Sequence, residues 1–339
     1  MAPGPVEPGV ARAVVVVGDL NADLVLELPD RDAPPAERVV REPRLTGGGT
    51  AANTAAALAR LGVAVEFVGS IGDDGFGRGL ADELQAAGVG TRGLVLTRDA
   101  ATCQVIAMVE PDGERYLVVW PTDGGALTRL SPADIGGDPI AGLIAGAAWL
   151  HTTGMCLRQA PIASSVLAAM RAARAAGVPV SLDLNLRIEL WGLRPEVLAV
   201  VSEAVSLADV VLGSGAEELV PLAWAGGSAV DDPEAAALAL AGTARTVVAR
   251  LGQAGALACS PGREVVRATG YATTLRNPVG AGDAFNGGFI AARVAGLTLP
   301  DALRWGNAVG ALKVAREGGA RDQPSRPEVE ALLAGAEWP

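Results

Sequence analysis

The segment from Asn277 to Phe289 carries the residue types and spacing best suited to chemistry. Gly280, Ala281 and Gly282 are small residues ahead of an expected helix, and Asp283 falls in its first turn. Backbone N–H groups at a helix N-terminus bind anions, and the helix dipole favours a phosphate there. The carboxylate could be only a helix-start acid, or it could act as a general base on a hydroxyl beside a bound phosphoryl group. The fragment alone leaves both interpretations open.

Basic side chains other than arginine are almost absent from the 339 residues, since Lys313 is the only lysine and His151 the only histidine. A P-loop needs a lysine beside its second glycine, and the residues around Lys313 do not form one. A multi-histidine metal site within one chain is excluded. No Gly-x-Ser-x-Gly elbow is present for a serine nucleophile.

The charge balance argues against several classes of partner. The chain has 27 basic and 38 acidic residues, a net charge of −11, and no basic stripe, so we expect neither a nucleic acid nor a membrane partner. Three cysteines far apart cannot complete a disulfide framework, which predicts a reducing, cytoplasmic location. The start of the chain lacks the pattern of a secretory signal. The uncharged stretch 140–157 is interpreted as a helix end followed by a buried strand.

Strands and helices alternate regularly after Pro132. This alternation predicts βαβ units and an α/β fold with a Rossmann-like, mostly parallel central sheet that has helices on both faces. The expected strands are 147–152, 178–183, 210–212 and 246–249. The expected helices are 161–176, 195–206, 232–241, 283–295 and 299–315, with a short one at 327–333.

The first part of the chain mixes two patterns. A buried strand at 13–17, a helix at 51–61, a strand at 63–68 and a helix at 79–87 continue the α/β pattern. Extended segments near 20–45 and 97–125 do not fit it, and a Pro-Asp-Gly turn at 111–113 predicts a hairpin. We therefore divide the chain into an α/β core (11–19, 46–96 and 127–333) and a small β-sheet lid (20–45 and 97–126).

Several segments resemble, in the same order, the signatures of the ribokinase-like (PfkB) carbohydrate kinase family. The segment 277–289 is similar to the C-terminal signature of that family, and Gly18–Asp23 resembles its N-terminal sugar-binding strand. Gly47–Asn53 resembles its first signature, and Arg250–Gly255 its nucleotide-side strand and glycine turn. The likeness covers nearly the full chain, and collinear motifs are more specific together than any one of them.

The resemblance implies an ATP-dependent kinase that uses Mg²⁺. Asp283 would be the catalytic base, and Gly280, Ala281 and Gly282 would form an anion hole for phosphate. The residues implied to hold sugar hydroxyls are Asp23, Gly48, Gly49 and Asn53. Those implied to line the nucleotide pocket are Gly252, Gly255 and Asn307. Taken without the resemblance, these positions read as an exposed strand carboxylate, turn glycines and helix amides with local bonds.

A second cluster follows an expected strand. Asp183 and Asn185 lie at its carboxyl end, where ligands bind in open parallel sheets, and Arg187 follows on the loop. The segment 181–191 is similar to the fructokinase and 2-keto-3-deoxygluconate kinase branch. We expect Asn185 to contact the nucleotide. Arg187 matches an arginine that binds a substrate carboxylate in keto-acid kinases, but it could equally tie the loop to a helix C-terminus.

The lid favours a neutral sugar. Keto-acid kinases carry a second arginine in the lid hairpin, and the nearest segment here, 118–121, has none. Trp120 could instead give the sugar a flat apolar wall, or it could belong to the core of the lid. We therefore favour a hexose such as fructose, with a sugar acid or a nucleoside as alternative substrates. A non-catalytic binding protein on this fold is a further alternative. An NAD-dependent oxidoreductase is disfavoured because no Gly-x-Gly-x-x-Gly follows a strand.

Cation sites depart from the family pattern. Asn277 and Pro278 stand where many members have Asp-Thr, whose aspartate helps bind a monovalent cation, so potassium activation is in doubt. Glu217 is the candidate for contacting Mg²⁺ through water, because Ser214–Glu217 stands where the family has an Asn-x-x-Glu motif. The motif could also be aligned so that it ends at Glu218. Alternatively, Glu217 could be only a solvated acid at a helix start. The expected small-molecule partners are the sugar and ATP, and lid dimerisation in the family implies a homodimer.

Overall fold

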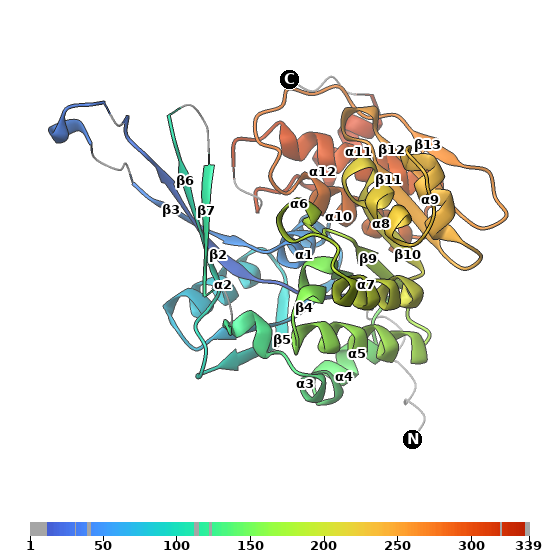
Figure 1. Cartoon of the computed structure of the whole chain (residues 1–339), viewed down its shortest axis with the longest axis horizontal. Coiled ribbons are helices and arrows are strands. Elements are labelled where there is room, and N and C mark those ends of the chain that lie inside the picture. The colour runs from blue at the N-terminus through green and yellow to red at the C-terminus, as the bar shows by residue number, and fades with distance from the viewer. Residues whose placement is uncertain are drawn as a thin grey trace.

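The computed structural model describes residues 12–30, 32–38, 42–111, 115–121, 124–318 and 321–335. Its main feature is a nine-stranded sheet with the order β13-β12-β11-β10-β9-β8-β1-β4-β5 (Figure 1). The strands from β11 to β5 in this order run parallel, and β12 and β13 are antiparallel. The bounds are Val14–Val17 (β1), Val65–Gly72 (β4), Gly90–Thr97 (β5), Trp149–Thr153 (β8), Val180–Asp183 (β9), Val210–Ser214 (β10), Thr246–Arg250 (β11), Ala256–Cys259 (β12) and Val266–Ala268 (β13).

Successive side chains of a strand point to opposite faces of the sheet, so the apolar residues of these strands make both faces apolar. Helices cover each face. In β1, Val14 and Val16 join one hydrophobic core, and Val15 and Val17 join the other. The first core is covered by α1 (Thr50–Arg60), α2 (Gly75–Ala86), α10 (Ala281–Val294), α11 (Leu299–Val314) and α12 (Arg326–Leu333). The second is covered by α3 (Pro132–Gly136), α4 (Ile140–Ala145), α5 (Ile162–Ala175), α7 (Pro195–Leu207), α8 (Val220–Ala225) and α9 (Pro233–Ala241). The predicted fold class is confirmed.

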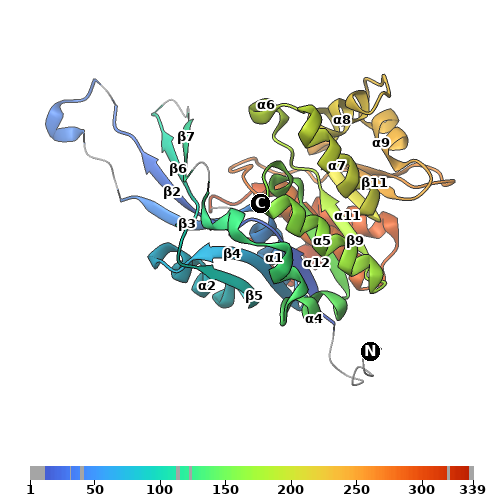
Figure 2. The same ribbon diagram turned by 60° about the horizontal axis from the view of Figure 1, so that its bottom comes forward.

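A four-stranded sheet with the order β3-β2-β6-β7 stands to one side of this body (Figure 2). Its strands are β2 (Asn21–Glu27), β3 (Arg44–Gly48), β6 (Gln104–Val109) and β7 (Arg115–Trp120). The extended segments near 20–45 and 97–125 therefore do pair, as predicted. The end of β3 runs three residues past the predicted lid boundary. Of the predicted turn at 111–113, residues 112 and 113 lie outside the described residues.

Some elements differ from the sequence prediction. The strand β5 was not predicted, because Gly90 and Gly93 weaken its strand pattern. Helix α2 begins at Gly75, four residues earlier than expected, because the Asp74 side chain caps it by accepting a hydrogen bond from the Gly77 N–H. Helix α10 begins at Ala281 rather than near 283. The uncharged stretch 140–157 resolves into α4 and β8, as predicted. In the part of the chain that the structure describes, no helix has the length and apolar character to cross a membrane.

Small residues let α1 and α10 pack closely. A Cβ atom added at Gly287 would lie 2.5 Å from the Cβ of Ala57, which is closer than real Cβ contacts allow. This approach brings Asn53 of α1 to Asp283 of α10, 230 residues away along the chain. The helix contact therefore positions the residues that the sequence singled out.

This packing predicts opposite effects for two glycine-to-alanine changes. Gly287→Ala should lower the free energy of unfolding by about 1–3 kcal/mol, since overpacking forces the two helices apart. Gly79→Ala is the matched control, because Gly79 is an exposed residue of α2 with no atom within 4 Å of an added Cβ. It should raise that free energy by up to about 1 kcal/mol through helix propensity. Urea unfolding measures both, and equal stabilisation by the two changes would contradict the close α1–α10 contact.

Candidate active site

A cavity of about 640 Å³ opens where the carboxyl ends of three parallel strands meet the start of α10. Asp183, Ser214 and Arg250 end β9, β10 and β11, and all three line the cavity. Ligands bind at such strand ends in open α/β sheets. The predicted site residues that line it are Asn185, Arg187, Glu217, Gly252, Gly255, Gly280, Ala281, Gly282, Asp283 and Asn307.

Asp283 is buried at the wall of this cavity. Its Oδ2 atom accepts a hydrogen bond of 2.9 Å from Nδ2 of Asn53. Burial raises the pKa of Asp283 to about 7, with smaller contributions from the charges of Asp183 and Asp19, while Asn53 and Arg250 act in the opposite direction. A carboxyl group with this pKa can accept a proton near neutral pH. Asn53 therefore does not bond only within its own helix, which was the alternative left open by the sequence.

The start of α10 forms an open anion site. Gly280 is the N-cap residue with φ of 79°, a left-handed conformation that favours glycine, and no side chain caps the first turn. Ala281 and Gly282 are thus the first residues of the helix and do not precede it. A Cβ atom at Gly282 would lie 3.5 Å from Cζ of Arg250, so a guanidinium faces the same turn. Helix dipole and guanidinium together favour a phosphate at this place.

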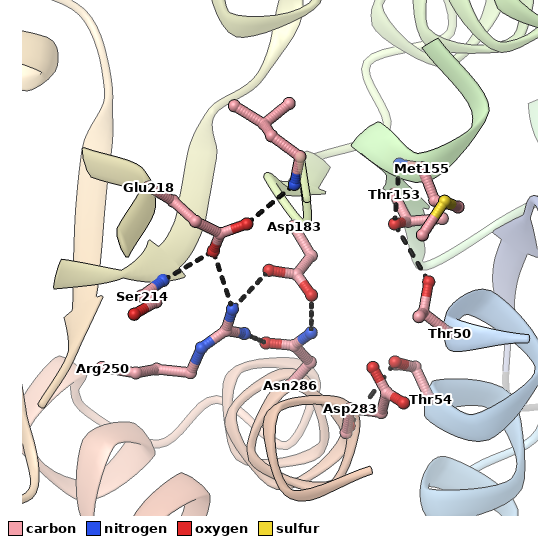
Figure 3. Close-up of polar contacts among 11 residues, drawn as sticks. Thr50, Thr54, Thr153, Met155, Asp183, Ser214, Glu218, Arg250, Asp283 and Asn286 are labelled. Atoms are coloured by element: carbon pink, nitrogen blue, oxygen red, sulfur yellow. Dashed lines mark hydrogen bonds and ion pairs between the residues drawn. The ribbon is translucent and has the colours of Figure 1, made fainter. Parts of the chain in front are cut away.

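Arg250, Asp183 and Asn286 form a closed ring of hydrogen bonds at the cavity wall (Figure 3). Arg250 donates to Asn286 Oδ1 at 2.8 Å and to Asp183 Oδ1 at 2.7 Å. Asn286 donates in turn to Asp183 Oδ2 at 2.9 Å. Every polar side-chain group in the ring has a partner, as buried polar groups require. The ring fixes the guanidinium relative to α10.

Glu218 adds a second buried carboxylate to this ring. It accepts hydrogen bonds from the backbone N–H groups of Leu186 and Ser214, at 2.8 and 2.7 Å, and lies 3.5 Å from Arg250. Burial raises the pKa of Glu218, and the charge of Asp183 adds to the shift. A π-helical turn over Gly215–Leu219 directs Glu218 inward and leaves Glu217 exposed at the cavity.

The acidic groups present fit Mg²⁺ only as a partner of bound phosphates. Among the described residues, no cluster of three or more His, Cys, Asp or Glu side chains is arranged to hold a metal ion. Mg²⁺ is commonly held by one or two carboxylates together with phosphate oxygens and water. Glu217 is exposed at the cavity and remains the candidate, whereas the Glu218 oxygens are engaged by backbone N–H groups.

The residues expected to hold the sugar lie on β2, β3 and α1 and do not line the cavity, but Asn53 connects them to Asp283. Gly48 ends β3, and a Cβ atom there would lie 2.4 Å from the Asp23 carboxylate, so only glycine fits. Gly49 is the N-cap residue of α1, the helix that carries Asn53. Asn21 donates to Asp23 at 2.5 Å. Burial raises the pKa of Asp23 to about 6, so Asp23 is not the exposed strand carboxylate of the alternative interpretation.

Arg321 is a site residue that the sequence analysis missed. It donates to Asn53 Oδ1 at 3.0 Å and to the Gly48 carbonyl at 3.1 Å. Its Nη1 atom lies 3.6 Å from a carboxylate oxygen of Glu83. With its Oδ1 bonded to Arg321, the Asn53 amide presents Nδ2 to Asp283. Arg321 belongs to no motif that the sequence analysis considered, so the sequence did not indicate this role.

Of four further predicted residues, Asn307, Asn185 and Arg187 line the cavity and Trp120 does not. Asn307 lines the cavity, but its amide donates to the backbone carbonyls of Ala268 and Thr269. Asn185 and Arg187 line it with φ of 31° and 48°, and Arg187 is exposed. Trp120 ends β7, is 51% exposed and is not among the cavity-lining residues.

Comparisons with known proteins give consistent results. The family described as pfkB family carbohydrate kinase matches residues 11–326. A fructokinase from Vibrio alginolyticus is 33% identical over 83% of this chain and 90% of its own. A 5-dehydro-2-deoxygluconokinase from Shouchella clausii is 30% identical over 84% of this chain and 86% of its own. The crystal structure of a fructokinase from Xylella fastidiosa with bound ATP has a TM-score of 0.80 at 29% identity, covering 96% of this chain and 99% of that chain.

The arginine ring predicts a large loss of stability when its cation is removed. Arg250→Met leaves Asp183 and Glu218 buried without their cation, so the free energy of unfolding should fall by about 3–5 kcal/mol. Arg171→Met is the control, since Arg171 pairs with Glu203 where both side chains are exposed, and it should cost less than about 1 kcal/mol. Denaturant unfolding near neutral pH measures both. Equal losses for the two variants would show that the ring does not stabilise the fold.

Proposed function

The chain belongs to the pfkB family of carbohydrate kinases, and we propose that it transfers the γ-phosphoryl group of ATP to a hydroxyl of a small sugar with Asp283 as the catalytic base. The observation that carries this proposal is the position of Asp283. Its buried carboxylate lies in the first turn of α10, beside an uncapped helix N-terminus and within one cavity with the strand ends. A proton acceptor and a phosphate site are thus adjacent.

The residues divide the chemical work. Asp283 takes the proton of the attacking hydroxyl, and Asn53 holds the carboxylate through its amide. The N–H groups at the start of α10 and the Arg250 guanidinium stabilise charge on the transferred phosphoryl oxygens. Mg²⁺ bound with ATP would neutralise phosphate charge, with Glu217 as its contact through water. The four-stranded sheet acts as a lid that excludes water from the reacting groups.

ATP is assigned to the part of the cavity that the residues after β11 line. Gly252, Gly255 and Asn307, the residues expected to contact the nucleotide, lie on the cavity wall together with Tyr271 and Leu275. An apolar and aromatic wall of this kind suits a flat base, as in most ligand pockets. Asn185 lies nearer the strand ends, where it would contact the phosphates.

A neutral sugar such as fructose is the favoured substrate. The side chains expected to contact it are the Asp23 carboxylate and the Asn53 amide, which suit hydroxyl groups. Arg321 is the cation at this end, and Glu83 lies opposite it. The exposed Arg187 supports a sugar acid as the second candidate, since a guanidinium can bind a carboxylate at two points.

A homodimer formed through the lid is part of the proposal. By the register of the small sheet, the exposed apolar side chains of Leu45, Tyr116 and Val118 lie on one face, which they offer to a second copy. Sedimentation velocity of the purified chain distinguishes a monomer from a dimer.

Replacing the base tests the proposed reaction. Asp283→Asn should lower kcat with Mg²⁺-ATP and the best sugar by about 10²- to 10⁴-fold, because only the proton acceptor is lost. The measurement is a coupled assay of ADP formation over hexoses, pentoses, sugar acids and nucleosides. At pH 8 the variant should be no less stable than the original chain, because it removes a desolvated charge. Near-normal turnover by Asp283→Asn would refute the assignment of the base, and no ATP consumption with any acceptor would refute the kinase.

The pKa of Asp283 predicts the acid side of the pH profile. In the protein without substrate, Asp283 has a pKa of about 7, and its carboxyl group must be deprotonated to act as a base. The value of kcat/KM should therefore rise through about pH 7 and then level off. Asn53→Ala removes a donor that favours the charged form, so this limb should move to higher pH. An acidic limb that stays in place in Asn53→Ala would contradict the link between the two residues.

A further inference from the structure

Lys313, the only lysine of the chain, is fully buried. It lies in the last turn of α11, where the helix dipole favours a cation. Its Nζ atom donates to the Gly318 carbonyl at 3.4 Å. A buried ammonium is costly unless oxygen atoms compensate it, so its retention at this point calls for a function.

The Gly318 carbonyl, which follows α11, also contacts the loop that leads into the anion site. Asn277 donates to it through Nδ2 at 3.1 Å, and Asn277 Oδ1 accepts from the Val279 N–H at 3.0 Å. The backbone N–H groups of Arg276 and Asn277 donate to the Val314 carbonyl at 2.8 and 3.1 Å. Lys313 and Asn277 therefore hold one carbonyl from two sides, next to the segment that ends at Gly280.

This arrangement does not fit a bound monovalent cation. Asn277 stands where many family members have an aspartate that helps bind such a cation, and an amide brings no negative charge. The Gly318 carbonyl, which could serve as a cation ligand, instead accepts N–H groups from both Lys313 and Asn277. A potassium ion would have to displace the ammonium and would meet its repulsion.

We propose that the Lys313 ammonium replaces a dissociable monovalent cation behind the anion site, so that phosphoryl transfer needs neither K⁺ nor Na⁺. The ammonium holds the loop carbonyl that a bound ion would hold, and it places a fixed positive charge behind the loop that leads to α10. Asn277 fits this role, because an aspartate there would add a second carboxylate to that of Asp322, whose charge already acts on the ammonium. Lys313 is in this view a positioning residue, and the inference rests on the proposed kinase function.

Salt replacement in the original chain tests the inference directly. At constant ionic strength, kcat/KM in KCl, NaCl and choline chloride should agree within about twofold, a difference worth less than half a kcal/mol. The melting temperature should be equal in KCl and choline chloride, because a site that binds no K⁺ gains no stability from it. Activation by K⁺ of about tenfold over choline, or a rise in melting temperature specific to K⁺, would overturn the inference.

Variants separate this role from a structural one. Lys313→Met should lower kcat by about tenfold or more, with a smaller change in the sugar KM, since the anion site loses its support. The double change Asn277→Asp with Lys313→Ala should create activation and thermal stabilisation by K⁺. Arg304→Met is the control, because Arg304 is an exposed cation on the same helix, 53% accessible, and it should leave kcat unchanged. Full activity of Lys313→Met in choline chloride would refute the role.

The thermal measurement keeps this inference separate from the proposed function. It needs no substrate, so a K⁺-specific shift in the original chain refutes the Lys313 role even where ATP turnover is normal. If no acceptor supports turnover and the melting temperature is the same in both salts, the kinase activity is refuted. The proposal that the Lys313 ammonium replaces a bound cation is then not contradicted. If Lys313→Met does not fold, the salt series on the original chain still decides the outcome.

Discussion

The close contact between α1 and α10 is the constraint on which the site depends. Gly287 meets Ala57 at a distance that leaves no room for a larger side chain, and the amide of Asn53 then reaches Asp283. The contact also buries Asp283, and burial is the main cause of its raised pKa. One steric condition therefore sets both the position and the proton affinity of the proposed base.

Buried charges at the strand ends are held by mutual compensation. Arg250 is shared by Asp183, Asn286 and Glu218, and Glu218 is further satisfied by two backbone N–H groups. Breaking such a set is costly because each remaining charge stays in a low-dielectric interior. The cost keeps the guanidinium in one orientation, beside the first turn of α10. Stability and preorganisation for a phosphate thus have the same source.

Three cations come to the region of the site from distant segments of the chain. Arg250 ends β11, Lys313 ends α11, and Arg321 follows the last long helix. Each donates a hydrogen bond to a carbonyl or amide oxygen: Arg250 to Asn286, Lys313 to Gly318 and Arg321 to Asn53. A site assembled in this way has no need of a P-loop lysine.

The sequence by itself determined the periodic pattern of the fold and the residues whose types are local to a motif. The strand–helix alternation predicted the parallel sheet, and the small residues at the start of α10 predicted a phosphate site. The role of Asp283 as the base came from the resemblance to the kinase family. The sequence could not predict that Arg250 joins Asp183 or that Arg321 orients Asn53, because these contacts join residues 67 and 268 positions apart. Only the tertiary structure decided them, and also which of Glu217 and Glu218 faces inward, because a single π-helical turn sets that choice. The sole lysine was visible in the sequence, but its burial against the Gly318 carbonyl depends on where α11 ends relative to the loop before α10.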